Sequence, residues 1–193
     1  MERRYLVWLG VFTAACSSAA PPPPVAVEPP PAAWPPPDAD TGISDPKLAD
    51  LFRREWASEL ELDPMNATTL GVHRFDDRVD DNSAEGIARR REVARSFLEE
   101  AQVLAARTDL APADRSSLEL LVESLEANVV SEVCAFEEWS LSASDNPLTR
   151  WNRLPEDQKV STPASGDTLV ARYALIPQHV DRELENLRRG LGR

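Results

Sequence analysis

An apolar stripe between residues 112 and 139 constrains the fold of this chain more than any other feature. Seven apolar side chains recur there, each three or four residues from another, the spacing that lines one face of an α-helix. They are Leu118, Leu121, Val122, Leu125, Val129, Val133 and Phe136. Pro112 suits the first turn of a helix, where its missing N–H costs no hydrogen bond. We therefore predict one helix over 112–139, with an apolar face that the rest of the chain must cover.

Three further segments carry apolar residues at helical spacing, each bounded by residues that start or stop helices. They are 44–63, 82–108 and 167–190. Asn82 is followed three residues later by a glutamate, as in a capping box, and Asp167 is the expected cap of the last helix. Pro177 should kink that helix, and Gly190 should end it. Together with the stripe above, these segments predict an all-α fold, a bundle of about four helices over 44–193.

Two of the connections have their own signals. Residues 65–70 should form a short turn of helix that stops at Gly71, because glycine readily takes the left-handed conformation that ends helices. Residues 140–166 are rich in Ser, Asn, Asp and Pro, and are predicted to form a long loop anchored by Trp151 and Leu154. A long loop in a compact domain often forms or covers a functional site.

The N-terminus is predicted to be an export signal. Residues 1–16, MERRYLVWLGVFTAAC, combine two arginines, a short apolar run and small residues before Cys16. About 11 apolar residues are too few to cross a bilayer, which takes about 20. The pattern resembles a bacterial lipoprotein signal, so residues 1–15 should be removed and Cys16 lipidated. A twin-arginine export signal and an uncleaved N-terminal anchor are the alternatives.

The lipidated cysteine would be followed by a tether. The chain has 17 prolines, and most of them lie between Pro21 and Pro37. Such a composition cannot bury a core and favours extended polyproline II, so 16–43 is predicted to be a spacer, with a proline-rich ligand as the alternative. The expected location is an envelope membrane, with the globular part facing the periplasm or the cell exterior.

Charge limits the partners of the folded part. The formal net charge is −12, and nucleic-acid binding needs a basic footprint, so nucleic acid is not an expected partner. Arginines cluster near the start of 82–108, and Glu132, Glu137 and Glu138 lie near the end of 112–139. An antiparallel hairpin of the two helices would place these opposite charges side by side. A docking surface for a basic partner is the alternative interpretation of the acidic run.

Three blocks of sequence carry a resemblance to a known family. They are 63–78 (DPMNATTLGVHRFDDR), 83–91 (SAEGIARRR), and 171–177 (ARYALIP) with 185–191 (ENLRRGL). In this order they resemble the N-terminal part of the bacterial domain of unknown function 885 family, over roughly residues 48–193. The resemblance implies a mostly α-helical, exported protein related to zinc metallopeptidases of the HExxH class. Its HExxxGH-like motif is absent from this chain, so the resemblance assigns no catalytic residue here.

No metal or cofactor site is predicted from the residues themselves. A metallopeptidase zinc site takes two histidines one helical turn apart and a carboxylate, whereas His73 and His179 are far apart in sequence. His179 should share a helix face with Glu183, and His73 precedes Asp76 by three residues, but such half-sites are common by chance. The histidines are expected to be polar surface or lid residues. Cys134 is expected to be packed in the core.

Two hypotheses about function follow. In the first, the chain is the N-terminal helical portion of a metallopeptidase-like protein, shaping a substrate cleft without being catalytic alone. In the second, it is a self-contained helical binding or scaffold lipoprotein. The last helix bears on both, because its apolar stripe should remain partly exposed and support self-association or contact with a catalytic segment. That stripe consists of Leu169, Tyr173, Ile176, Val180, Leu184 and Leu187.

Overall fold

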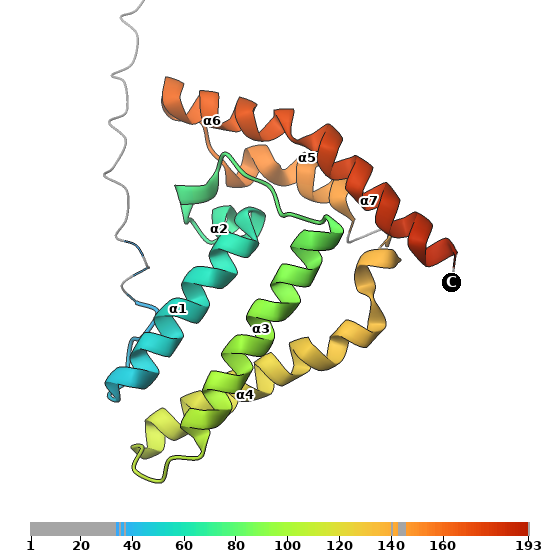
Figure 1. The fold of residues 1–193 in the computed structure, drawn as a ribbon. Helices are drawn as coiled ribbons and strands as arrows, with labels where there is room; N and C mark the ends of the chain where they lie inside the picture. Colours follow the sequence, from blue (N-terminus) through green and yellow to red (C-terminus); the bar gives the residue numbers. More distant parts are fainter. Residues whose placement is uncertain (1–33, 35, 37, 140, 143–145, 193) are drawn as a thin grey trace, which may run out of the picture.

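The computed structural model describes residues 34, 36, 38–139, 141–142 and 146–192, and within these ranges the chain is helical and has no strand (Figure 1). The predicted all-α class is confirmed. The α-helices are α1 (Pro46–Leu62), α2 (Pro64–Thr69), α3 (Ala84–Ala105), α4 (Pro112–Ser131), α5 (Pro147–Asp157), α6 (Pro163–Ala174) and α7 (Ile176–Leu191). Three short 3-10 helices accompany them: η1 (His73–Phe75), η2 (Glu132–Cys134) and η3 (Phe136–Glu138).

The expected signal peptide and the lipidated Cys16 lie outside the described residues. The packed part of the chain begins before residue 44, because Trp34 meets the ring of Phe75 edge to face at 5.1 Å. Asp40 pairs with Arg53 of α1 at 2.6 Å. In the described part of the chain, no helix is both long enough and apolar enough to span a membrane.

The first two helices form where capping chemistry predicts them. Asp45 accepts hydrogen bonds from the backbone N–H groups of Lys47 and Leu48, so α1 starts at Pro46. Asp63 both ends α1 and caps α2, whose exposed end is closed by Gly71 at φ 81°. The predicted helix over 44–63 and the short turn that follows it are confirmed.

The predicted hairpin of α3 and α4 is also confirmed. The two helices pack against each other and against α1 around one apolar cluster. Its buried members are Leu48, Leu51, Ala101, Leu104, Leu110, Leu118, Leu121 and Leu125. Arg91 reaches Glu137 at 2.7 Å, and Arg95 pairs with Glu132, so the antiparallel helices offset each other's charges. One detail differs, because Ser83 caps α3 in place of Asn82, whose side chain is used elsewhere.

The helix predicted over 112–139 ends early. It stops at Ser131, and two 3-10 turns follow on either side of Ala135, which adopts a left-handed conformation at φ 44°. This turn rotates the end of the apolar stripe away from the core, leaving Val133 85% and Phe136 52% exposed. Cys134 is exposed as well, so its predicted place in the core is wrong.

The long loop predicted over 140–166 is wrong for most of its length. Asn146 forms a capping box with Thr149 and starts α5, and Thr162 forms another with Ser165 and starts α6. Each helix also has proline in its first turn, where it is tolerated. Ser, Asn, Thr and Pro therefore mark helix starts in this segment. Asp167, the expected cap, lies inside α6.

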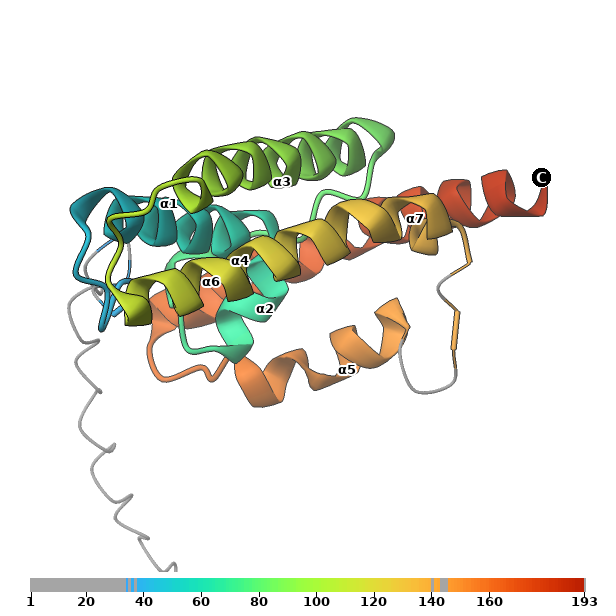
Figure 2. The same ribbon diagram turned by 90° about the horizontal axis from the view of Figure 1, so that it is seen from below.

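Pro177 breaks the last predicted helix into α6 and α7, with the junction at Leu175. The first half of the apolar stripe is covered, because Leu169, Tyr173 and Ile176 pack against a buried cluster of Met65, Trp151 and Leu154. In the second half, Leu184 is 41% exposed, whereas Val180 and Leu187 are half-buried, so the prediction that part of the stripe faces solvent is confirmed at Leu184. Figure 2 shows α3 and α5 on opposite sides of the molecule in that view, with α1, α4 and α7 between them.

Gly190 was predicted to end the last helix, but it lies within α7. A Cβ atom at Gly190 would overlap the backbone carbonyl oxygen of Glu138 in η3. Glycine is therefore required by the close approach of α7 to η3. The contact also explains the early end of α4, because the turn at Ala135 brings η3 against α7.

Gly190→Ala is expected to lower the free energy of unfolding by about 1–3 kcal/mol, because the added methyl group must push α7 away from η3. Gly192→Ala is the matched control, since a Cβ there meets only ordinary contacts at 3.6 Å. Urea denaturation followed by circular dichroism measures both. Equal stability of the two variants would show that α7 does not pack closely on η3.

Candidate functional site

A buried arginine holds together the elements around the candidate site. Arg172 of α6 is 0% exposed and donates five hydrogen bonds to groups that come from α2, the segment 73–78 and the end of α5. The acceptors are the carbonyl oxygens of Pro64, Phe75 and Arg78, Thr68 Oγ1 and Gln158 Oε1, at 2.7–3.2 Å. The segment that leads into α3 is thereby fixed on α2 and α6.

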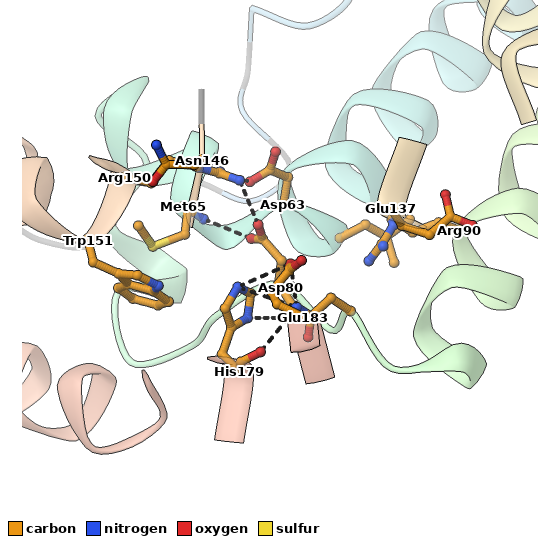
Figure 3. Close-up of a pocket in the computed structure, with 12 residues that line it drawn as sticks. Asp63, Met65, Asp80, Arg90, Glu137, Asn146, Arg150, Trp151, His179 and Glu183 are labelled. Atoms are coloured by element: carbon orange, nitrogen blue, oxygen red, sulfur yellow. Dashed lines mark hydrogen bonds and ion pairs between the residues drawn. The ribbon is translucent and has the colours of Figure 1, made fainter. Parts of the chain in front are cut away.

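A pocket of about 330 Å³ lies between these elements and α7 (Figure 3). Its walls come from the α1–α2 junction, from the segment that precedes α3, and from α5 and α7. The lining residues are Leu62, Asp63, Met65, Asp80, Asn82, Arg90, Glu137, Asn146, Arg150, Trp151, His179 and Glu183. The pocket therefore joins side chains that are far apart in the sequence.

One side of the pocket is an ion cluster. Arg150 donates to Asp80 Oδ2 and to Asp63 Oδ1, each at 3.0 Å. Burial and the neighbouring Asp63 carboxylate raise the pKa of Asp80 to about 6. The single guanidinium of Arg150 thus pairs with two carboxylates. Figure 3 shows Asp80 between Asp63 and His179.

The other side is built around His179, which is buried on α7. Its Nδ1 lies 3.3 Å from the backbone oxygen of Asp80, and its ring meets that of Trp151 edge to face at 5.2 Å. Burial lowers the pKa of His179, so the ring is neutral at pH 7. Asn82 Nδ2 donates to Glu183 Oε1 at 2.6 Å and to the backbone oxygen of His179 at 3.3 Å.

Two buried polar atoms of the pocket residues have no hydrogen-bond partner among the described residues: Asn82 Oδ1 and Trp151 Nε1. We call them the two open atoms. Both side chains are 6% exposed, and a buried polar group without a partner costs about 1–3 kcal/mol. Such atoms are rare in folded proteins and mark places where a ligand or water completes the structure.

The two histidines of the chain are not brought together. His73 Nδ1 lies 2.9 Å from Asp76 Oδ2, whereas His179 Nε2 lies 3.7 Å from Glu183 Oε1, as their spacing on a helix predicted. Throughout the described ranges, no group of three His, Cys, Asp or Glu is placed to hold a metal ion. These residues do not fit a zinc site with two histidines and a carboxylate. His179 is buried, so the surface or lid position expected for it is wrong.

Most pocket residues were not predicted as site residues. Trp151 was expected only as a loop anchor, and Glu183 only as a neighbour of His179. Asp80 and Arg150 carried no signal of their own, because their contacts with each other and with Asp63 join residues distant in sequence. The one local indication was the assignment of Asn82 as a cap, a role that Ser83 takes instead.

A family model described as "Bacterial protein of unknown function (DUF885)" matches residues 64–193. The match covers more than half of the chain and includes most of the pocket, so the protein belongs to the DUF885 family. Neither a curated protein nor a solved structure matches the chain.

Asp80 makes the stability of the site depend on pH. Its folded-state pKa, about 6, lies above the ordinary 3.8 of an aspartate. The folded state thus holds the proton of Asp80 more tightly than the unfolded state does. The stabilisation that results is fully present below pH 3.8 and is lost as the pH rises through about 6.

Asp80→Asn removes this loss, because its amide stays neutral at every pH. Relative to the wild type, its free energy of unfolding should increase by roughly 1–3 kcal/mol between about pH 4 and about pH 7. Urea titrations at the two pH values measure the change. Asp77→Asn, at an exposed carboxylate nearby, should show no such change. A pH-independent difference between Asp80→Asn and the wild type would contradict the raised pKa.

Proposed function

We propose that this chain is an exported lipoprotein of the bacterial envelope, anchored through Cys16, whose helical part binds a small polar ligand for a metallopeptidase-like protein. The anchor rests on the residues MERRYLVWLGVFTAAC at the start of the chain. Several acyl chains on one cysteine give stable attachment, where a single chain is marginal.

One observation carries the binding role: the two open atoms of the pocket, Asn82 Oδ1 and Trp151 Nε1. A ligand that supplies their missing hydrogen bonds recovers the free energy that their burial costs. The pocket volume of about 330 Å³ suits a small molecule or one residue of a longer ligand.

Membership of the DUF885 family and the three resembling sequence blocks support the metallopeptidase-like interpretation. The first and third blocks meet at Arg172, and the first block contributes Asp63 and Met65 to the pocket lining. In this proposal the helical part shapes and binds the substrate, and none of the described residues is assigned a catalytic role.

A self-contained binding or scaffold module is the second candidate, and the exposed apolar side chains favour it. Val133, Phe136 and Trp139 near the end of α4, with Leu184 and Leu191 on α7, are between 41% and 89% exposed. Exposed apolar area of this kind marks an interface, so self-association or contact with a further segment belongs to this proposal.

The anchor depends on a single residue. Expression of the full chain in a Gram-negative host with labelled palmitate should label the wild type and leave Cys16→Ser unlabelled, because only the thiol of Cys16 is in the position that a lipoprotein signal acylates. Cys134→Ser is the matched control and should be labelled like the wild type. Equal labelling of the two serine variants would end the lipoprotein interpretation.

The described part should do no metal chemistry by itself. We expect the purified full chain to retain no stoichiometric zinc after dialysis, since a reactive zinc site takes about three protein ligands and His73 and His179 are in separate places. Metal analysis of the wild type, His73→Ala and His179→Ala decides it. One tightly held zinc per chain, lost in either variant, would contradict this prediction.

A further inference from the structure

We propose that the pocket recognises a primary ammonium group next to a carbonyl or carboxylate oxygen, as in an amino acid, an amino acid amide or the amino end of a peptide. This inference rests on the proposal that the pocket binds a ligand, and it names the chemistry of that ligand. Four features of the pocket carry it: the orientation of one amide, one carboxylate without a counterion, the excess of carboxylates over guanidinium groups and one indole N–H.

The orientation of the Asn82 amide is fixed. Its Nδ2 donates to Glu183 Oε1 at 2.6 Å and to the backbone oxygen of His179 at 3.3 Å, which oxygen in its place could not do. Oδ1 must therefore be the atom left without a partner, and it is an acceptor. The ligand must bring a hydrogen-bond donor to this position.

The donor group should carry a positive charge. Glu183 forms no ion pair with an arginine or lysine within 4 Å in the described part of the chain, and its one pair at that distance is with His179 at 3.7 Å. That ring is kept neutral because burial lowers its pKa. Glu183 and Asn82 Oδ1 thus form an acceptor pair with one uncompensated negative charge, which suits an ammonium with three N–H donors.

Most of the remaining charges of the pocket are paired. Arg150 bridges Asp63 and Asp80, Arg90 donates to the backbone oxygen of Asp81 at 2.5 Å, and Glu137 pairs with Arg91. Arg90 has no carboxylate partner within 4 Å among the described residues, but the pocket lining carries four carboxylates against two guanidinium groups, so its net charge repels an anion. A metal ion is also disfavoured, because the described carboxylates and histidines include no group of three suited to it.

The second open atom requires a hydrogen-bond acceptor on the ligand. Trp151 Nε1 is a donor only, so the ligand must present an oxygen acceptor to it. In Figure 3 the indole nitrogen lies on the side of the Trp151 ring that faces Asp80 and His179. A ligand with an ammonium at Glu183 and a carbonyl oxygen at Trp151 would satisfy both open atoms.

The test uses the full chain in detergent micelles and three probes: glycinamide, N-acetylglycinamide and acetate. Glycinamide has both the ammonium and the carbonyl, N-acetylglycinamide lacks the charge, and acetate is an anion. Glycinamide should bind with a dissociation constant of order millimolar and shift the indole N–H resonance of Trp151, which is assigned from Trp151→Phe. Calorimetry measures the affinities.

Glu183→Gln should weaken glycinamide binding about tenfold or more, because it removes the charge of the ammonium's acceptor. Glu185→Gln, at an exposed position of the same helix, is the matched control and should leave binding unchanged. Trp151→Phe keeps an aromatic ring and removes the N–H. It should weaken glycinamide but leave methylamine, which has no carbonyl, unaffected. This second variant keeps the test decisive should Glu183→Gln misfold by circular dichroism.

The outcomes separate the two proposals. If N-acetylglycinamide or acetate binds at Trp151 as well as glycinamide does, or if Glu183→Gln is as tight as Glu185→Gln, the ammonium inference is wrong and the pocket still binds a ligand. If none of the probes perturbs Trp151, both the inference and the binding role are wrong. When glycinamide binds as expected, comparison with triglycine and with free glycine shows whether a peptide or an amino acid is the preferred source of the group.

Discussion

The hydrogen bonds of the Arg172 guanidinium are the interaction on which the packing of α2, the segment 73–78, α5 and α6 depends. A guanidinium has five N–H donors, and all five are used on acceptors from three separate segments. Burying a charge without such partners would cost several kcal/mol, and a nearby carboxylate, Asp76 at 3.8 Å, adds compensation. Two of the acceptors, the backbone carbonyls of Phe75 and Arg78, belong to the segment 73–78, which contains only one short 3-10 turn. The arginine therefore supplies hydrogen bonds that fix the backbone of the segment 73–78. Because Asp80 and Asn82 follow this segment directly, their positions at the pocket depend on it as well.

Much of the fold could be predicted because its causes are local. The caps of α1 and α2 and the apolar spacing of α3 and α4 act within a few residues, and the charges of Arg91 and Glu137 follow from pairing two neighbouring helices. The prediction for the segment 140–166 was wrong for an equally local reason. Capping residues and loop residues are chemically the same, so Asn146 and Thr162 were assigned to a loop when each starts a helix.

The early end of α4 could not be predicted in this way. Its apolar stripe continues to Phe136, and nothing nearby in sequence forbids a helix there. The cause is a distant contact, since η3 lies against Gly190 of α7, and only a turn such as that at Ala135 brings it there. The pocket was hidden for the same reason. Asn82 and Glu183 are 101 positions apart and meet only after α7 has packed on the segment before α3.

The pocket also couples elements that otherwise share few contacts. Of the two open atoms, one belongs to Trp151 on α5, and the other to Asn82, which is held by α7 through Glu183 and its backbone. A ligand that satisfies both atoms would link α5 to α7 by hydrogen bonds that the protein alone does not make. Since a ligand that binds only the folded state stabilises it, the position of α5 would then depend on occupancy. Ligand binding and the packing of α5 against α7 therefore depend on the same two atoms, Trp151 Nε1 and Asn82 Oδ1.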